Sequence, residues 1–302
     1  MKTLFIFSSI LFLFTVGCSS VGEKYLRACE KGDYDKVLGI KSKVDLNATN
    51  EDGANGLMSA AYNGNLEIVE YLIEKKIDIG HLDELGNSAL FYALYSDNSN
   101  VITSISEEMI KSGRMDLVKD FFFYISENRY SNLMRELLSQ GVPPTFYGNN
   151  GWTPLMNAAW VGDIETSKIL IEAGSQIDAR SKDDDKTWAL MLAVFADHPD
   201  VFKLLIDNGA DFSLKNSDKE TALIQAIKLN RVSILKKMIS MGLNVNESYE
   251  EIPVLFIAKA MGHNEIVKAL LNVGVDTAMI LNGKTITYEH FLELSKSYDF
   301  DY

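Results

Sequence analysis

The chain has 302 residues, of which 47% are hydrophobic and 24% charged, so it can bury a sizeable core. Five prolines and twenty glycines exclude collagen-like and low-complexity chains. A formal net charge of -13 repels phosphate backbones and argues against nucleic acid as a partner. Two cysteines and four histidines are too few for a disulfide framework and leave little material for a metal centre.

Residues 1–17 have the features of a secretory signal peptide. Lys2 precedes an apolar run from Leu4 to Val16, about 13 residues long, whereas a membrane-spanning helix needs about 20. The run ends in Thr15-Val16-Gly17-Cys18, which resembles the lipobox of bacterial lipoproteins. In that family the signal is cut just before a cysteine that carries a diacylglycerol group. Thr15 departs from the pattern, since the family usually has leucine there.

The lipobox resemblance implies that Cys18 is lipidated and becomes the first residue of the mature protein. It also implies a second acyl chain on the new amino terminus, which makes membrane attachment stable. We therefore expect residues 18–22 to form a lipidated tether and the protein to be exported and held on a membrane of the bacterial cell envelope. The alternative is an ordinary cleaved signal in which Cys18 has no lipid.

Residues 23–302 repeat a pattern with a period of about 33 residues. The clearest copy begins at Gly151-Trp152-Thr153-Pro154-Leu155 and continues through Ala158-Ala159 and Gly162. Leucine, alanine, paired aliphatic and glycine residues recur in the same places in the other copies. The units are expected near 23–50, 51–83, 84–116, 117–148, 149–181, 182–215, 216–247 and 248–280, with a cap at 281–302.

These residues resemble the ankyrin repeat. Thr153-Pro154-Leu155 matches its turn and helix start, Ala158-Ala159 its pair of small residues, and Gly209-Ala210-Asp211 the entry to its finger. The resemblance implies an all-α solenoid of helix-turn-helix units with β-turn fingers, of about eight repeats including degenerate caps. Because one unit cannot bury its own apolar face, the units must stack.

Three parts of the chain depart from the repeat pattern. Residues 25–47 are expected to be an N-terminal cap, and the unit from Gly86 has a longer second helix. The unit at 117–148 lacks a Thr-Pro-Leu motif, and its first helix is expected to start at Phe121-Phe122-Phe123. Residues 284–302 are expected to form a half-repeat that closes the stack.

The sequence predicts no catalytic site, no metal site and no cofactor. The four histidines are far apart, and His263 occupies a position that the ankyrin family uses structurally. Asp183-Asp184-Asp185 lacks the spaced ligands of a calcium loop and is expected to be a solvated turn. Paired carboxylates such as Asp83-Glu84 are expected to lie unburied in the fingers. Cys29, within a helical pattern, is expected to be a small buried thiol.

A row of aromatic residues is predicted on the side of the first helices that faces away from the core. With the first-helix leucine at zero, the alanines three and four places on fall at about 300° and 40°, and the fifth residue at about 140°. That fifth residue is Tyr62, Tyr95, Trp160 and Phe195 in four units, with Met261 near the end. Glu127 and Lys228 interrupt the row. Aromatics that merely fill gaps between stacked helices are the alternative explanation.

The predicted binding site combines this row with acidic finger tips. In ankyrin proteins the row and the tips form the concave contact surface, and the tips here include Asp184 and Asp185. Trp152 and Trp160 lie in one unit, with Val161 after Trp160, so this unit is the predicted hot spot. We therefore expect a non-catalytic scaffold that binds a protein, basic in charge, and takes no nucleic acid or small-molecule substrate. The alternative function is an inhibitor, protector or accessory subunit of an enzyme or toxin in the cell envelope.

Overall fold

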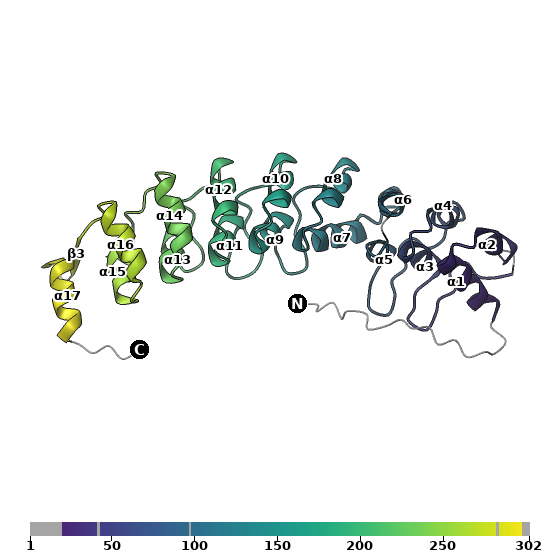
Figure 1. Cartoon of the computed structure of the whole chain (residues 1–302), viewed down its shortest axis with the longest axis horizontal. Helices are drawn as coiled ribbons and strands as arrows, with labels where there is room; N and C mark the ends of the chain where they lie inside the picture. The colour runs from purple at the N-terminus through teal and green to yellow at the C-terminus, as the bar shows by residue number, and fades with distance from the viewer. Residues whose placement is uncertain (1–19, 41–42, 97, 282–283, 298–302) are drawn as a thin grey trace. The chain divides into compact units, whose positions relative to one another are not determined.

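The computed structural model describes residues 20–40, 43–96, 98–281 and 284–297 (Figure 1). The chain divides into two compact units, the first ending at Val118 and the second beginning at Lys119. Each unit is a series of helix pairs joined by finger-like turns. In the described residues the pairs number eight, followed by a single helix, which confirms the predicted helical solenoid of about eight repeats.

The first unit contains three complete helix pairs. They are α1 (Val21–Lys31) with α2 (Tyr34–Ile40), α3 (Gly56–Tyr62) with α4 (Leu66–Glu74), and α5 (Ala89–Ala93) with α6 (Ser99–Lys111). Within this unit α3 packs between α1 and α5, and α4 packs on α6. Helix α6, with 13 residues, is longer than α4 with nine, as the sequence predicts.

The second unit continues the same arrangement in pairs. They are α7 (Met115–Glu127), which starts at the end of the first unit, with α8 (Ser131–Ser139), α9 (Pro154–Val161) with α10 (Ile164–Glu172), α11 (Ala189–Phe195) with α12 (Pro199–Asp207), α13 (Ala222–Lys228) with α14 (Val232–Ser240), and α15 (Val254–Ala260) with α16 (Asn264–Asn272). First helices pack on first helices, as α9 does on α11, and second helices pack on second helices, as α10 does on α12.

Within the part of the chain that the structure describes, two short antiparallel hairpins add strand structure to the helical domain. Strands β1 (Ser248–Tyr249) and β2 (Ile252–Pro253) form one finger. Strands β3 (Ala278–Leu281) and β4 (Lys284–Thr287) form the other and lead into α17 (Tyr288–Ser297). The last described residues therefore form a finger and one helix, and the predicted half-repeat at 284–302 extends into residues 298–302, which lie outside the described residues.

The Thr-Pro-Leu motif starts a helix for local reasons. The Thr153 hydroxyl accepts a hydrogen bond from Met156 N at 3.3 Å, so it satisfies a backbone donor that the helix cannot. Pro154 takes the first helical position, where its missing N–H is not needed. Leu155 is buried, and Ala158 and Ala159 are fully buried against the neighbouring helices. Small side chains here allow helices to approach to about 8 Å.

Two predicted boundaries differ from those of the structure. Helix α1 begins at Val21 because the Ser20 hydroxyl accepts from Glu23 N at 3.1 Å, so the last residues of the predicted 18–22 tether are helical. Helix α7 begins at Met115, just after the left-handed turn at Gly113. The three phenylalanines at 121–123 therefore lie in the middle of α7, and the prediction that they start the helix is wrong.

Side chains at the start of the second helices join neighbouring repeats by hydrogen bonds to backbone carbonyls. In the second unit His198 Nε2 donates to Trp160 O at 3.1 Å, and His263 Nδ1 donates to Ile227 O at 2.8 Å. Asparagine and arginine make equivalent bonds elsewhere, namely Asn65 Nδ2 to Cys29 O, Asn98 Nδ2 to Gly64 O, and the Arg231 guanidinium to Phe195 O. The predicted structural role of His263 is thus confirmed.

Gly162 shows why this junction needs glycine. Its φ is +71°, a left-handed conformation that ends α9, and an added Cβ would lie 2.5 Å from His198 Nδ1. The glycine therefore leaves room for the histidine that ties the next repeat to this one.

Candidate protein-binding surface

Two tyrosines of the predicted row lie on the surface of the first unit. Tyr62 is the last residue of α3, and Tyr95 follows Leu94, the C-cap of α5. Their exposed fractions are 39% and 52%, whereas Ala61 and Ala93 beside them are fully buried. The helical periodicity thus separates core positions from surface positions as the angular calculation expects.

The two tyrosine rings form a pair, here called the tyrosine platform (Tyr62 and Tyr95). Their centroids are 5.3 Å apart and their planes differ by 33°. The ring of Tyr92 contacts Tyr62 edge-on at 6.5 Å, and its hydroxyl donates to Asp83 Oδ2 at 2.8 Å. Because Tyr92 is buried and bonded to the finger, it holds the platform against the repeat.

A hollow of about 470 Å³ opens beside the platform. It is lined by the two platform rings and by the turns that follow α3 and α5, that is by Tyr62, Asn63, Gly64, Tyr95, Ser96 and Asn98. The Asn98 amide donates to Gly64 O at 3.0 Å, which fixes one wall across two repeats. Among the described residues, the lining has aromatic faces and neutral polar groups and no charged side chain.

In the second unit the aromatic pair consists of two tryptophans. Trp160 lies in the last turn of α9 and is 44% exposed. Trp152, on the preceding finger, is half-buried, and its ring centroid lies 5.9 Å from that of Trp160 at an angle of 66°. Trp152 Nε1 donates to Asp183 Oδ2 on the next finger at 3.0 Å. Val161, which follows Trp160, is half-buried.

The rest of the predicted row is uneven. Phe195, at the end of α11, is half-buried rather than exposed, and the Arg231 side chain of the next repeat donates to its carbonyl. In the next repeat the equivalent position is occupied by Lys228, as the sequence shows. Met261, near the end of the row, is exposed. The structure therefore brings Trp152 and Trp160 together and leaves Phe195 as a weaker part of the surface.

The acidic fingers of the first unit are exposed except at one position. Glu51, Asp52 and Glu84 are exposed, and Glu84 N donates to Asp52 O at 3.1 Å, so the two fingers lie side by side. Asp83 is buried, because its carboxylate accepts from Asn87 N at 2.7 Å as well as from the Tyr92 hydroxyl. The expectation that nothing buries this carboxylate is wrong.

The finger at 182–186 carries charge of both signs. Asp184 and Asp185 are exposed, and this part of the prediction of a solvated turn agrees with the structure. Asp183 differs, since it accepts from Trp152 and from the Ser181 hydroxyl. Exposed Lys182 and Lys186 flank the aspartates and partly cancel their field.

A family model described as "Ankyrin repeats (3 copies)" matches residues 26–116, 121–216 and 190–280. The chain belongs to the ankyrin-repeat family. Ankyrin repeats imply a scaffold for protein interaction and a domain that is typically non-catalytic. The residues that carry the pattern in sequence, such as Thr153-Pro154-Leu155, lie within the matched ranges.

Several known proteins contain similar repeats. A homologue of transient receptor potential cation channel subfamily A member 1 from Caenorhabditis elegans is 28% identical over 151 residues, which are 50% of this chain and 12% of that protein. Potassium channel AKT2/3 of Arabidopsis thaliana is 29% identical over 168 residues, 54% of this chain and 20% of the channel. An ankyrin repeat protein of fowlpox virus (strain NVSL) is 26% identical over 172 residues, 57% of this chain and 39% of the viral protein.

The chain thus spans less than half the length of each of these relatives. Among solved structures, the human ASB11 ankyrin repeat domain is similar with a TM-score of 0.39 at 16% identity, covering 86% of this chain and 88% of that one.

One charged cluster on the ankyrin surface was not predicted. Glu220 is buried at the finger position that corresponds to Trp152, and it accepts from Gln225 and from Lys228. The ammonium of Lys228 also lies 5.0 Å from the ring centroid of Tyr249 on the next finger. The hydrogen bond to Glu220 raises the pKa of Lys228. Glu220 directly precedes the helix start Thr221-Ala222-Leu223, as Trp152 precedes Thr153-Pro154-Leu155, and this equivalent position could have identified it.

A second unpredicted feature is a buried tryptophan. Trp188 stands at the cap position that Thr153 holds in the preceding ankyrin repeat, and it is fully buried. The Arg180 guanidinium lies 4.1 Å from its ring centroid. Burial lowers the pKa of Arg180. This tryptophan belongs to the core and not to the surface row.

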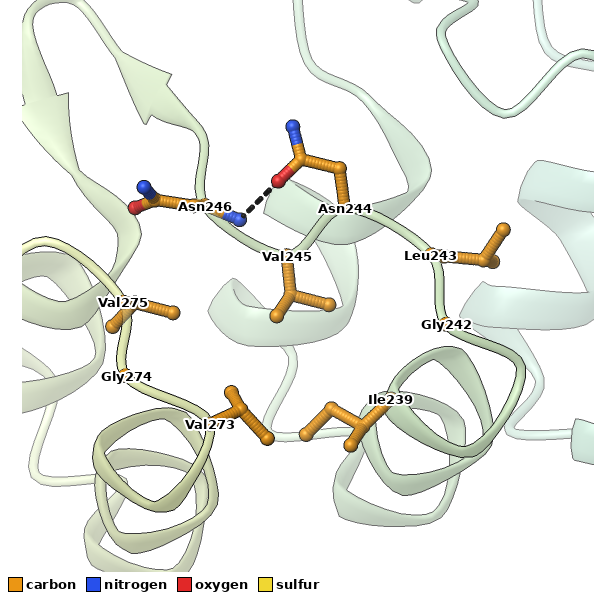
Figure 2. A pocket seen from close by; sticks show the side chains of 9 residues that line it. All are labelled: Ile239, Gly242, Leu243, Asn244, Val245, Asn246, Val273, Gly274 and Val275. Carbon is orange, nitrogen blue, oxygen red and sulfur yellow. Dashed lines mark hydrogen bonds between the residues drawn. The ribbon is translucent and has the colours of Figure 1, made fainter.

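A smaller hollow of about 290 Å³ lies between the ends of α14 and α16 (Figure 2). Its apolar lining includes Ile239, Val245 and Val273, and Asn246 N donates to Asn244 Oδ1 at 2.9 Å at its edge. The Asn246 side chain bonds to Asp276. Since no group in the lining titrates near neutral pH, this hollow offers no acid–base chemistry.

Within residues 20–40, 43–96, 98–281 and 284–297, no cluster of three or more histidine, cysteine, aspartate or glutamate side chains could hold a metal ion. Cys29 is buried as predicted, and burial raises the pKa of its thiol to about 12. Among the same described residues, no helix has the length and apolar character required to cross a bilayer. Cys18, the predicted lipidation site, lies outside the described residues.

Proposed function

We propose that this ankyrin-repeat protein is an exported, lipid-anchored scaffold that binds a protein partner through its aromatic row. One observation supports this binding surface. Tyr62, Tyr95 and Trp160 occupy equivalent positions in three repeats, and all three are exposed. Large apolar side chains on a surface mark interaction sites when they recur together. Tyrosine and tryptophan are also enriched among residues that dominate binding energy.

The proposed attachment to a membrane rests on the sequence. Cys18 follows an apolar run that resembles a lipoprotein signal. If the chain is cut before Cys18, only Ser19 and Ser20 separate the lipidated residue from α1, which would hold the first repeat close to the bilayer.

A partner-capture experiment tests the binding function. The full chain is crosslinked in membrane extracts of its source cells, and the recovered proteins are compared with those recovered by Trp160→Ala. We expect one protein to be lost with Trp160→Ala and to bind the purified wild type about thirtyfold more tightly than the variant, on the scale of a hot-spot residue. Equal recovery and equal affinity for both chains would remove Trp160 from the binding surface.

Mass spectrometry of the mature protein tests the anchor. The expected product begins at Cys18, carries a lipid mass on that residue and partitions into detergent, whereas Cys18→Ala blocks processing or releases the protein. An unmodified wild-type protein that starts at another residue would contradict the lipid anchor and leave the binding surface untouched.

A further inference from the structure

The tyrosine platform of the first unit differs from the rest of the row in its charge environment. Residues 44–74 and 77–110 contain no lysine and no arginine. The two lysines between these segments follow α4, and one of them, Lys75, is paired with Glu74. Of the remaining cations of these two repeats, Lys111 and Arg114 are paired with Glu107 and Asp116. Within the described residues, the exposed finger carboxylates of Glu51, Asp52 and Glu84 form no salt bridge.

Tyr92 connects the second finger to the platform, because its hydroxyl donates to Asp83 Oδ2 at 2.8 Å and its ring contacts Tyr62. Burial and the hydrogen bond to Asp83 raise the pKa of Tyr92, and the Asp52 carboxylate and Tyr95 raise it further. The negative charge of these fingers therefore belongs to the same two repeats as the platform. The hydrogen bond from Glu84 N to Asp52 O places the second acidic finger beside the first.

The geometry of the platform selects between two ways of binding a cation. Insertion of a flat cation between two rings requires about 7 Å, twice the contact distance of roughly 3.5 Å. The platform centroids are only 5.3 Å apart, so the rings cannot enclose a cation between them. A cation can instead lie on their exposed outer faces, beside the hollow of about 470 Å³.

We propose that the tyrosine platform binds an arginine side chain presented by a segment of the protein partner. The planar guanidinium stacks on the exposed faces of Tyr62 and Tyr95, and its N–H groups point to the finger carboxylates. Arginine fits better than lysine because a guanidinium stacks on aromatic faces and donates two parallel hydrogen bonds to a carboxylate, whereas an ammonium is compact and strongly hydrated. The inference rests on the proposed interaction function and adds the chemistry of the partner at this unit.

A direct binding measurement tests this inference without knowledge of the natural partner. The probe is a short fluorescent peptide of alternating arginine, glycine and serine, titrated with the full chain in detergent and followed by anisotropy. Matched peptides contain citrulline or lysine in place of arginine. Citrulline keeps the shape of the side chain and removes its charge.

The expected results separate the platform from the tryptophan pair. Tyr95→Ala and Tyr62→Ala each weaken binding of the arginine peptide by about tenfold, within the range for a cation over an aromatic ring, while Tyr62→Phe, which keeps the ring, changes it by less than about threefold. Asp52→Asn combined with Glu84→Gln weakens binding and reduces its salt dependence. Trp160→Ala, in the second unit, leaves the peptide affinity within about twofold of the wild type.

Three outcomes would overturn the inference. Equal binding of the citrulline peptide would show that charge is not recognised, and equal binding of the lysine peptide would remove the preference for arginine. An undiminished affinity of Tyr95→Ala would place the peptide elsewhere. The partner-capture result with Trp160→Ala is independent of all three, so the scaffold function can stand when the arginine site fails.

Discussion

The two units present the same repeat position in different chemical settings. In the first, Tyr62 and Tyr95 belong to repeats whose fingers carry exposed Glu51, Asp52 and Glu84, and residues 44–74 and 77–110 contain no lysine or arginine. In the second, Trp160 is supported by Trp152, whose indole is bonded to Asp183. Lysines lie beside the exposed aspartates of that finger.

The repeat thus determines where an aromatic side chain is exposed, while the residues of the fingers determine which charge lies in the same repeat. Glu220 illustrates the point in the second unit, because its negative charge is satisfied internally by Lys228 and is not offered to a partner. A count of acidic residues at the finger tips therefore overstates the negative field of the second unit. The first unit is the stronger candidate for attraction of a cationic ligand.

The largest effect we predict distinguishes surface from core tryptophans of the second unit. Trp188→Ala empties a fully buried site and should lower the free energy of unfolding by about 3 to 5 kcal/mol. Trp160→Ala should change it by less than about 0.5 kcal/mol, because exposed substitutions usually have small effects. Urea unfolding followed by circular dichroism measures both. A large loss for Trp160→Ala would show that Trp160 is part of the core and does not correspond to the exposed tyrosine platform.

The second prediction concerns the internal pair of the second unit. Lys228→Met leaves the buried Glu220 carboxylate without its cation and should lower stability by about 1 to 2 kcal/mol, less than for a fully buried pair because Lys228 is partly exposed. The double variant with Glu220→Gln should recover part of this loss, since no unpaired charge then remains. Failure of the double variant to recover any stability would contradict an internally satisfied carboxylate.

The same pair predicts a pH dependence. Glu220 raises the pKa of Lys228 above its usual 10.5, so the folded state holds this proton more tightly than the unfolded chain. The contribution to stability is complete below pH 10.5 and is lost as the pH rises through the pKa of the folded state. The difference in unfolding free energy between the wild type and Lys228→Met should therefore shrink above pH 10.5. A difference that stays constant or grows would show that the pair does not titrate as described.

The smallest effect should appear in association rates. Reversal of Glu51 and Asp52 to lysine should slow association with an arginine-rich peptide by about tenfold at low salt, whereas reversal of Asp184 and Asp185 should slow it by about twofold. Dissociation rates should change little in either variant, because rim charges act mainly on encounter. Stopped-flow measurements at several salt concentrations check both. Equal slowing by the two reversals would erase the difference between the units.

Much of the fold could be predicted from the sequence because the repeat pattern is local. A threonine cap, a proline at the first helical position and an alanine pair act within a few residues, as the α9 repeat shows. The start of α7 could not be predicted in this way, because its repeat has no such motif. The position of Phe121 is set by packing instead.

The surface was harder to predict because it depends on contacts between repeats. Helical periodicity identified Tyr62, Tyr95 and Trp160 as off-core positions, and all three are exposed. Phe195 has the same spacing but is half-buried, and Asp83 is buried by partners that include the Tyr92 hydroxyl, nine residues away. Such contacts follow from three-dimensional neighbours, which a single-sequence pattern does not contain.

The hydrogen bonds between neighbouring repeats also bear on how such a chain can change its length during evolution. Each bond runs from a side chain at the start of one second helix to a carbonyl of the repeat before it, a separation of 34 residues for Asn98 and 38 for His198. Asparagine, histidine and arginine all fill this position. A duplicated repeat would bring its own donor and its own acceptor, so a junction inside either unit can receive a new module without redesign of its neighbours. Gene duplication could lengthen the array in this way. Each added repeat would contain one more residue at the position of Tyr62, Tyr95 and Trp160, and substitutions there would not disturb the core.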